Sequence, residues 1–282
     1  MDGTDGTAGI AFVKGHGTRN DFVLLPDPER TLDLTPQLVT ALCDRRGGIG
    51  ADGVLRVVRS RFDPEAAAMA DAAEWFMDYR NADGSLSQTC GNGLRVFARY
   101  LVVSGLAPAG RISIATRAGV VHVDAGPDGD ITADMGVPAV FDTSFATVDG
   151  TKYEGLHVSM GNPHLVCFID TPVENLDLSG IPDVDASVFP DGVNVEFVGV
   201  ADDAHAVMRV HERGVGETAS CGSGACAVAA ALGVRQGVTS GEWVLDVPGG
   251  RLGLRLDGDS GHVFLTGPAV LVAHGHWTAG AA

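Results

Sequence analysis

Two cysteines, Cys90 and Cys221, open nearly identical turns with the sequences Cys-Gly-Asn-Gly and Cys-Gly-Ser-Gly. Each turn runs into an apolar segment with helical spacing, so each thiol is predicted at the N-terminus of a helix. Exposed backbone N–H groups and the helix dipole favour negative charge there. Such a position binds a carboxylate and is expected to lower the pKa of the thiol toward neutrality. The pattern predicts two acid/base groups that face one bound molecule.

Two opposed thiols are suited to inverting a carbon centre without a cofactor. One thiolate removes a proton from one face, and the second group, held as a thiol, delivers a proton to the other face. The unperturbed thiol pKa of about 8.5 needs only a modest change for this work. A carbanion next to a carboxylate would be stabilised by the N–H groups of the two helix ends. The residues therefore indicate an amino-acid racemase or epimerase.

The similarity between the two cysteine turns extends into their flanks, which indicates a duplicated domain. Asn81 stands nine residues before Cys90, and Glu212 stands nine residues before Cys221. Downstream, Met-Gly-Val-Pro-Ala-Val at 135–140 corresponds to Leu-Thr-Gly-Pro-Ala-Val at 265–270. A repeat of this length is too long for a solenoid and fits two domains of ordinary size.

The expected fold class is α+β, with two pseudo-symmetric domains, each an antiparallel barrel-like sheet wrapped around a central helix. We predict a first domain at residues 1–134 and a second at 135–268, with the last strand, 269–274, returning to the first. Helices are predicted at 35–46, 93–104 and 225–234, the last apolar on nearly every side and therefore buried. The high glycine content, 39 of 282 residues, agrees with many short strands and tight turns.

Composition excludes several classes of protein. A formal net charge of −17 disfavours binding to nucleic acid or to an anionic membrane. No apolar run reaches the length of a membrane span, and residues 1–10 show no secretory pattern. An odd count of five cysteines fits a reducing cytoplasm.

The sequence also predicts that no cofactor is needed. The chain has two lysines, Lys14 and Lys152, and neither lies in a context for a pyridoxal Schiff base. The step from Cys221 to Cys226 is not a zinc-binding spacing, so no metal is expected. We interpret Cys43, Cys167 and Cys226 as inert buried thiols.

Seven segments that span nearly the whole chain, in the same order, make the sequence resemble the diaminopimelate epimerases. They are Gly15-His-Gly-Thr-Arg-Asn-Asp-Phe22, Asn81-Ala-Asp-Gly-Ser85, Cys90-Gly-Asn-Gly93, Gly161-Asn-Pro-His164, Asp191-Gly-Val-Asn194, Glu212-Arg-Gly-Val-Gly-Glu217 and Cys221-Gly-Ser-Gly224. A Cys-Gly-x-Gly pair alone would be shared with proline racemases. The segments that begin at Asn81 and Glu212 discriminate between the two families.

The resemblance implies interconversion of LL- and meso-diaminopimelate for lysine and peptidoglycan precursors, in the cytoplasm, with a homodimer as a possible assembly. It implies Cys90 and Cys221 as the catalytic pair, with His164 and Glu212 tuning the thiols. The substrate-binding residues that it implies are Asn20, Asn81, Gly91, Asn92, Asn162, Asn194, Glu212, Arg213, Gly222 and Ser223. Two positions depart from the family pattern: some members have glutamine where this chain has Gly53, and many have glutamine where it has Thr89.

Three alternatives stay open at this stage. The first is a racemase or epimerase for proline or another amino acid with a single charged end. The second is a thiol–disulfide or anion-binding protein without turnover. The third is an isomerase of the phenazine pathway, against which the two cysteines count. The turn asparagines and His164 also have a purely structural interpretation, since such side chains often serve the backbone.

Overall fold

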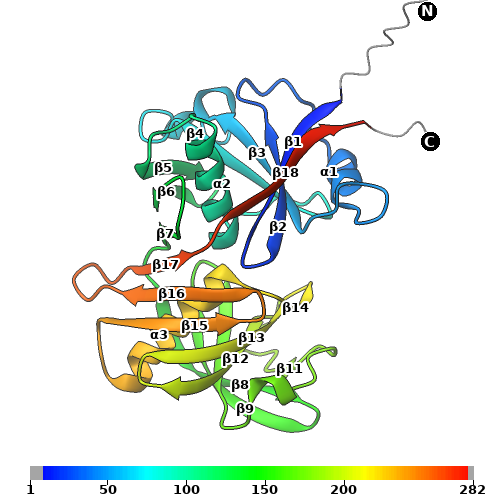
Figure 1. The fold of residues 1–282 in the computed structure, drawn as a ribbon. Coiled ribbons are helices and arrows are strands. Elements are labelled where there is room, and N and C mark those ends of the chain that lie inside the picture. The colour runs from blue at the N-terminus through cyan, green and yellow to red at the C-terminus, as the bar shows by residue number, and fades with distance from the viewer. Residues whose placement is uncertain (1–8, 279–282) are drawn as a thin grey trace, which may run out of the picture. The chain divides into compact units, whose positions relative to one another are not determined.

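The computed structural model describes residues 9–278, and their contacts divide the chain into two compact units (Figure 1). The first unit contains residues 21–122 and both ends of the described chain; the second contains 18–20 and 123–268. Residues 123–134, assigned by the repeat pattern to the end of the first domain, have their contacts in the second unit. The predicted domain limits stay a prediction. Residues 1–8 of the predicted first domain lie outside the described part of the chain.

The first unit packs a buried helix, α2, against strands from both ends of the chain. Helix α2 contacts β1, β3, β4 and β18, and β18, red in Figure 1, pairs antiparallel with β1, coloured blue. The elements that lie wholly or mainly in this unit are β1 (Ile10–Gly17), β2 (Asn20–Pro26), α1 (Pro36–Cys43), β3 (Gly53–Arg59), η1 (Ser60–Phe62), η2 (Ala67–Met69), β4 (Trp75–Asn81), α2 (Gly91–Val103), β5 (Gly110–Thr116), β6 (Gly119–Ala125) and β18 (Val270–Trp277).

The second unit repeats this plan around α3, which contacts β9, β10, β12, β15, β16 and β17. Most of α3 is buried, as its apolar sequence predicted, and its alanines form one core with the strands around it. The elements are β7 (Ile131–Asp134), β8 (Ala139–Val148), β9 (Thr151–Ser159), β10 (Pro163–Phe168), η3 (Val173–Asn175), β11 (Asp183–Val184), β12 (Asn194–Asp202), β13 (His205–Glu212), β14 (Gly216–Thr218), α3 (Gly222–Gln236), β15 (Gly241–Val247), β16 (Gly250–Leu256) and β17 (Val263–Gly267).

The strand pairing refines the expected architecture. Sheets around central helices are present, which confirms the α+β class, but over the described residues the sheet is not closed. Strands β2 and β3, β4 and β5, β10 and β12, and β13 and β15 pair in parallel. Helix α1 connects the first of these pairs, α2 the second and α3 the last. A parallel pair needs a long crossover, and α1, α2 and α3 supply it for three of the four pairs, so the expectation of antiparallel sheets was wrong at these pairs.

The helices differ from the predicted ranges at N-termini and at C-termini. Helices α2 and α3 start at Gly91 and Gly222, directly after their cysteines, because the thiols cap them. Helix α1 ends at Cys43, before the predicted residue 46, and its chain turns at Asp44. No helix among residues 9–278 is long and apolar enough to cross a membrane.

Candidate active site

Both cysteines occupy N-cap positions, as the sequence predicted. The Cys90 sulfur accepts a hydrogen bond from the backbone nitrogen of Gly93 at 3.5 Å, at the start of α2. The Cys221 sulfur accepts the equivalent bond from Gly224 at 3.4 Å, at the start of α3. Cys90 is half-buried and Cys221 is buried. The duplicated turns therefore hold the two sulfurs in the same local geometry.

The electrostatic setting of Cys221 differs from the expected one. Burial raises the pKa of the Cys221 thiol well above 9.0, and the nearby carboxylates of Glu212 and Glu196 raise it further. Hydrogen bonds from Ser223 and Gly224 oppose the increase without reversing it. The prediction that the helix end lowers the pKa was wrong for Cys221, because loss of hydration outweighs the backbone dipoles.

Two strands of the second unit, β10 and β12, direct polar side chains toward α3. His164 on β10 pairs in register with Asn194 on β12, so these side chains and that of Glu196 lie on one face of the sheet. Valines on that same face pack against α3. The Nδ1 atom of His164 lies 2.7 Å from Oε1 of Glu196, and its Nε2 atom lies 3.2 Å from Oδ1 of Asn162. His164 is thus fixed on both ring nitrogens.

Asn194 has a mainly structural set of contacts. Its Nδ2 donates to the carbonyl of Pro163 at 3.0 Å, and its Oδ1 accepts from the backbone nitrogen of Arg213 at 3.0 Å. Arg213 is exposed and extends toward the carbonyl of Asp191. Asn194 therefore positions the loop that carries the exposed Arg213 side chain.

Glu212 ends β13 and accepts a hydrogen bond from the hydroxyl of Thr218. The Ser223 hydroxyl lies 3.6 Å from the Cys221 sulfur. Gly222 is the first residue of α3 and is buried. Of the predicted residues of this half, Ser223 and Glu212 are thus the ones that interact with the Cys221 thiol.

The turn between β1 and β2 belongs to the second unit. Thr18 and Arg19 have φ angles of 48° and 64°, which non-glycine residues rarely adopt. The Thr18 hydroxyl donates to Ser220 at 2.7 Å, and Ser220 is the residue before Cys221. This bond holds the turn, and with it Asn20, beside the Cys221 helix end.

In the first unit, Asn81 and Asn92 have defined partners of their own. Asn81 ends β4 and donates through Nδ2 to the hydroxyl of Ser85 at 3.0 Å, within a tight turn. Asn92 is buried, and its Oδ1 accepts from Arg95 at 2.8 Å. Arg95 also donates to the carbonyl of Gly91 at 3.2 Å. The fully buried Arg95 therefore braces the first turn of α2.

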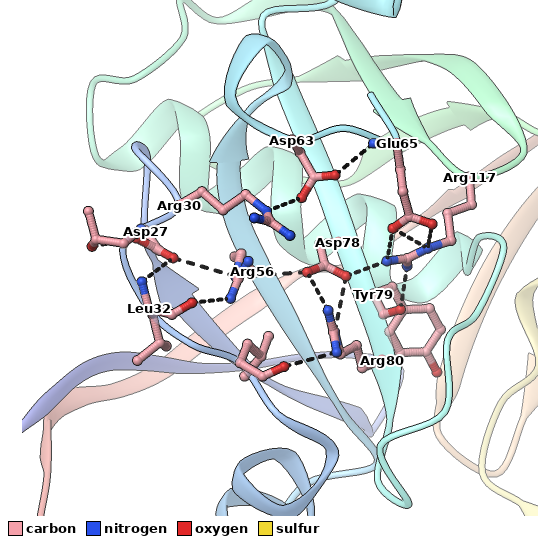
Figure 2. Close-up of polar contacts among 12 residues, drawn as sticks. Asp27, Arg30, Leu32, Arg56, Asp63, Glu65, Asp78, Tyr79, Arg80 and Arg117 are labelled. Carbon is pink, nitrogen blue, oxygen red and sulfur yellow. Dashed lines mark hydrogen bonds and ion pairs between the residues drawn. The ribbon is translucent and has the colours of Figure 1, made fainter. Parts of the chain in front are cut away.

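An ionic network on the outer side of β3 and β4 supports the Asn81 and Cys90 segments (Figure 2). Asp78 lies among Arg56, Arg80 and Arg117, and the closest pair is Arg117 Nη2 to Asp78 at 2.6 Å. Arg117 also donates to the carbonyls of Tyr79 at 2.8 Å and Ser87 at 3.3 Å. Arg117 thereby ties the end of β4 to the segment that leads into Cys90.

The two departures from the family pattern have different surroundings. A Cβ atom on Gly53 would stand 2.6 Å from the carbonyl oxygen of Arg80 and 2.7 Å from Cε2 of Tyr79. No side chain fits there, so the aromatic ring of Tyr79 fills the space beside Gly53. The hydroxyl of Thr89 is buried and has no hydrogen-bond partner within the described residues.

Sequence reasoning missed Glu196, Arg95 and Arg117. Each is a charged residue inside an otherwise apolar stretch or at a tight turn. A lone charge in the buried strand of Glu196 is rare without a partner, and that was the signal available. Two of these residues also make the two units differ. The first turn of α2 contacts the guanidinium group of Arg95, whereas the first turn of α3 contacts the carboxyl group of Glu196.

Among the described residues, no group of three or more histidine, cysteine, aspartate or glutamate side chains could hold a metal ion. The polar groups at the two helix ends are thiols, amides, carboxylates and backbone N–H groups. Their chemistry is that of proton transfer and carboxylate binding.

The two units, each with strands packed around a helix that a cysteine caps, define the structural class of this protein. A phenazine biosynthesis protein of the PhzF family from Bacillus anthracis superimposes with a TM-score of 0.70 and 15% identity, over 95% of this chain and 99% of that one. A hydroxyproline epimerase from Agrobacterium vitis superimposes with a TM-score of 0.66 and 16% identity, over 95% and 92%. These likenesses show the shared fold.

Sequence comparison narrows the class to one family. The family model for diaminopimelate epimerase matches residues 12–141 and 156–272. Curated diaminopimelate epimerases from Acidothermus cellulolyticus and Streptomyces coelicolor are 50% and 51% identical. These alignments cover 94% and 95% of this chain, and 95% of each relative. The chain belongs to the diaminopimelate epimerase family, which confirms the family, and with it the isomerase, predicted from the seven segments.

Proposed function

We propose that this protein interconverts LL- and meso-diaminopimelate without a cofactor, as a step toward lysine and peptidoglycan precursors. The observation that carries the proposal is the pair of duplicated helix caps, Cys90 and Cys221, in a chain of this family. Each cap supplies one sulfur and a set of backbone N–H donors. An α-carbon that carries a carboxylate needs both kinds of group.

The proposed reaction balances with the two sulfurs alone. One thiolate takes the α-proton, so the Cα–H bond breaks and an S–H bond forms. The other cysteine gives its thiol proton to the opposite face, so its S–H bond breaks and a new Cα–H bond forms. The thiol and the thiolate have then exchanged roles, and proton exchange with water after product release restores them for the next turnover.

The backbone N–H groups at the two helix ends would hold the carboxylate next to the reacting carbon. We assign this role to Gly91, Asn92, Gly222 and Ser223, which form the first turns of α2 and α3. Negative charge spreads onto that carboxylate when the proton leaves. Donors fixed by the helices stabilise it at no cost of reorganisation.

Substrate contacts away from the reacting carbon are assigned to polar side chains near the two turns. Glu212 would accept an ammonium group and Arg213 would bind a carboxylate. Asn20, Asn81 and Asn162 would supply amide donors and acceptors, and Asn194 would act through Arg213. A site that must pair both charged ends rejects amino acids with one end, because its polar groups would be left unpaired.

The test is incorporation of solvent deuterium at the α-carbon of LL-diaminopimelate, compared among the parent, Cys90→Ala and Cys221→Ala. We expect exchange and epimerisation by the parent and loss of epimerisation in both variants. Full epimerisation by either variant excludes the two-thiol reaction. Turnover of proline without diaminopimelate would favour a proline-type racemase. Binding of diaminopimelate without exchange would favour an anion-binding protein.

We also propose a cytoplasmic location and a homodimeric assembly. The location is supported by the buried free thiols of Cys43 and Cys167, which fit a reducing compartment. The assembly rests on the family resemblance alone. Light scattering of the purified protein tests it, and a monomeric mass would contradict it.

A further inference from the structure

Glu196 is a buried acidic residue that the proposed reaction does not use. It lies on β12, and its side chain is fully buried. Its Oε1 atom contacts the ring of His164, while Oε2 is buried with no hydrogen-bond partner within the described residues. Burying a carboxyl group with one unpaired oxygen costs stability, and an apolar residue of the same size would avoid this cost. The position therefore has another reason for its acid.

The surroundings of Glu196 place it next to the reacting end of α3. A Cβ atom on Gly224 would stand 2.5 Å from Oε1, so the carboxyl group lies directly against the first turn of the helix that Cys221 caps. The other titratable groups that interact with Glu196 are Cys221, Glu212 and Cys167. His157 on β9 interacts electrostatically with His164.

We propose that Glu196 is a positioning residue, which fixes the orientation and the tautomer of His164 at the Cys221 side of the site. Nε2 of His164 faces Oδ1 of Asn162 at 3.2 Å, and an amide oxygen only accepts, so Nε2 must carry a hydrogen. Nδ1 faces the Glu196 carboxyl group at 2.7 Å. The proposal rests on the proposed function, in which His164 serves the thiol chemistry.

The Nε2–H donor is kept in either protonation state of the pair. If Glu196 is ionised, the imidazolium carries hydrogens on both nitrogens. If Glu196 is protonated, its O–H donates to Nδ1 and the neutral ring carries its hydrogen on Nε2. Burial raises the pKa of Glu196, and the interaction with His164 opposes this increase. Without the carboxyl group, the ring is free to rotate and to exchange tautomers.

Two variants separate this role from a structural one. Glu196→Gln keeps a donor for Nδ1 and the same shape, whereas Glu196→Met keeps the shape without a polar partner. We expect Glu196→Met to fold with a Tm below that of the parent, because the apolar side chain suits the buried position but leaves Nδ1 of the buried His164 without its partner. Its kcat should fall on the order of tenfold to a hundredfold, with KM for diaminopimelate changed by less than about threefold. Glu196→Gln should retain kcat within about threefold.

Nitrogen NMR of the His164 ring gives a readout that does not depend on turnover. In the parent we expect a protonated Nε2 at neutral pH, and in Glu196→Met a mixture of the two neutral tautomers. The matched control is Asp246→Asn, since Asp246 contacts His205 at 2.8 Å in a half-exposed pair of the same unit. That control should leave both the His164 signals and kcat unchanged.

Several results would overturn the proposal. They are parent-like kcat in Glu196→Met, equal losses in the Met and Gln variants, and a parent ring with hydrogen only on Nδ1. If Glu196→Met does not fold, the parent spectrum alone decides. If the parent does not epimerise diaminopimelate, the proposed function fails, while the spectra still report whether Glu196 fixes the His164 ring.

Discussion

Gly224 lies so close to Glu196 that a Cβ atom at position 224 would stand 2.5 Å from Oε1 of the carboxyl group. The equivalent glycine of the first turn, Gly93, has a different neighbourhood. The nearest atoms to a Cβ there are those of Cys90 and Leu55, at 3.5 Å, which is ordinary contact. The space at position 224 therefore admits only glycine, whereas the space at position 93 also admits a Cβ atom.

Replacing Gly224 by alanine should destabilise the protein by about 1–3 kcal/mol, because Glu196 or the helix must move to make room. Replacing Gly93 by alanine should leave stability unchanged or raise it by up to about 1 kcal/mol, because alanine is the better helix former. Unfolding in urea, compared between the two variants and the parent, measures both effects. Equal destabilisation by the two substitutions would show that the Glu196 contact is not the cause.

Replacing Glu212 by glutamine should lower the pKa of Cys221. Burial is the largest cause of the raised pKa and stays in place, but the first of the two carboxylate contributions is lost. The thiolate fraction at a given pH should rise. The midpoint of Cys221 alkylation by iodoacetamide, followed by peptide mass spectrometry, should then move to lower pH. Asp246→Asn serves as a control, and an equal displacement in that variant would refute the local origin.

Replacing Arg117 by methionine should destabilise the protein by about 3–5 kcal/mol. The substitution leaves Asp78 without its closest partner and frees the carbonyls of Tyr79 and Ser87 (Figure 2). The control is Arg59→Met, which breaks a more exposed ion pair with Glu74 and should cost less than about 1 kcal/mol. Denaturant unfolding of both variants measures the difference, and similar losses would contradict a special role for the buried network.

Asp21 should stabilise the fold in a pH-dependent way. Burial raises the pKa of Asp21, but hydrogen bonds and charges from Arg45 and Lys14 outweigh it and lower the pKa from 3.8 to about 2. A depressed pKa gives stability that is present above pH 3.8 and is lost as the pH falls through about 2.

Asp21→Asn should therefore cost about 1–2 kcal/mol at neutral pH, and the difference from the parent should vanish as the pH approaches 2. Unfolding free energies measured between pH 2 and pH 7 test this. Asp71→Asn, on an exposed turn, should change stability by less than about 0.5 kcal/mol at every pH. A constant difference between Asp21→Asn and the parent at all pH values would exclude the titration of Asp21 as its source.

Local patterns predicted some elements well and others not at all. The apolar run of α3 and the capping positions of Cys90 and Cys221 could be predicted, because they depend on residues next to one another in the chain. Strand β8 was not predicted, since its first half is exposed and shows no alternation of buried and exposed residues. The parallel pairs could not be predicted either. Whether two strands pair in parallel depends on which strands become neighbours in the folded sheet, and local sequence patterns do not show this.

The amino-acid sequence by itself determined the duplicated design, the two thiols at helix ends and the family, because short-range geometry and motif order carry that information. Only the tertiary structure decided the charges around those thiols. Glu196 and His164 come together from two separate strands, and Arg117 reaches the Cys90 segment from a distant turn. Burial and electrostatic interactions depend on what surrounds a group in space, so the raised pKa of Cys221 has no signature in the turn that contains it.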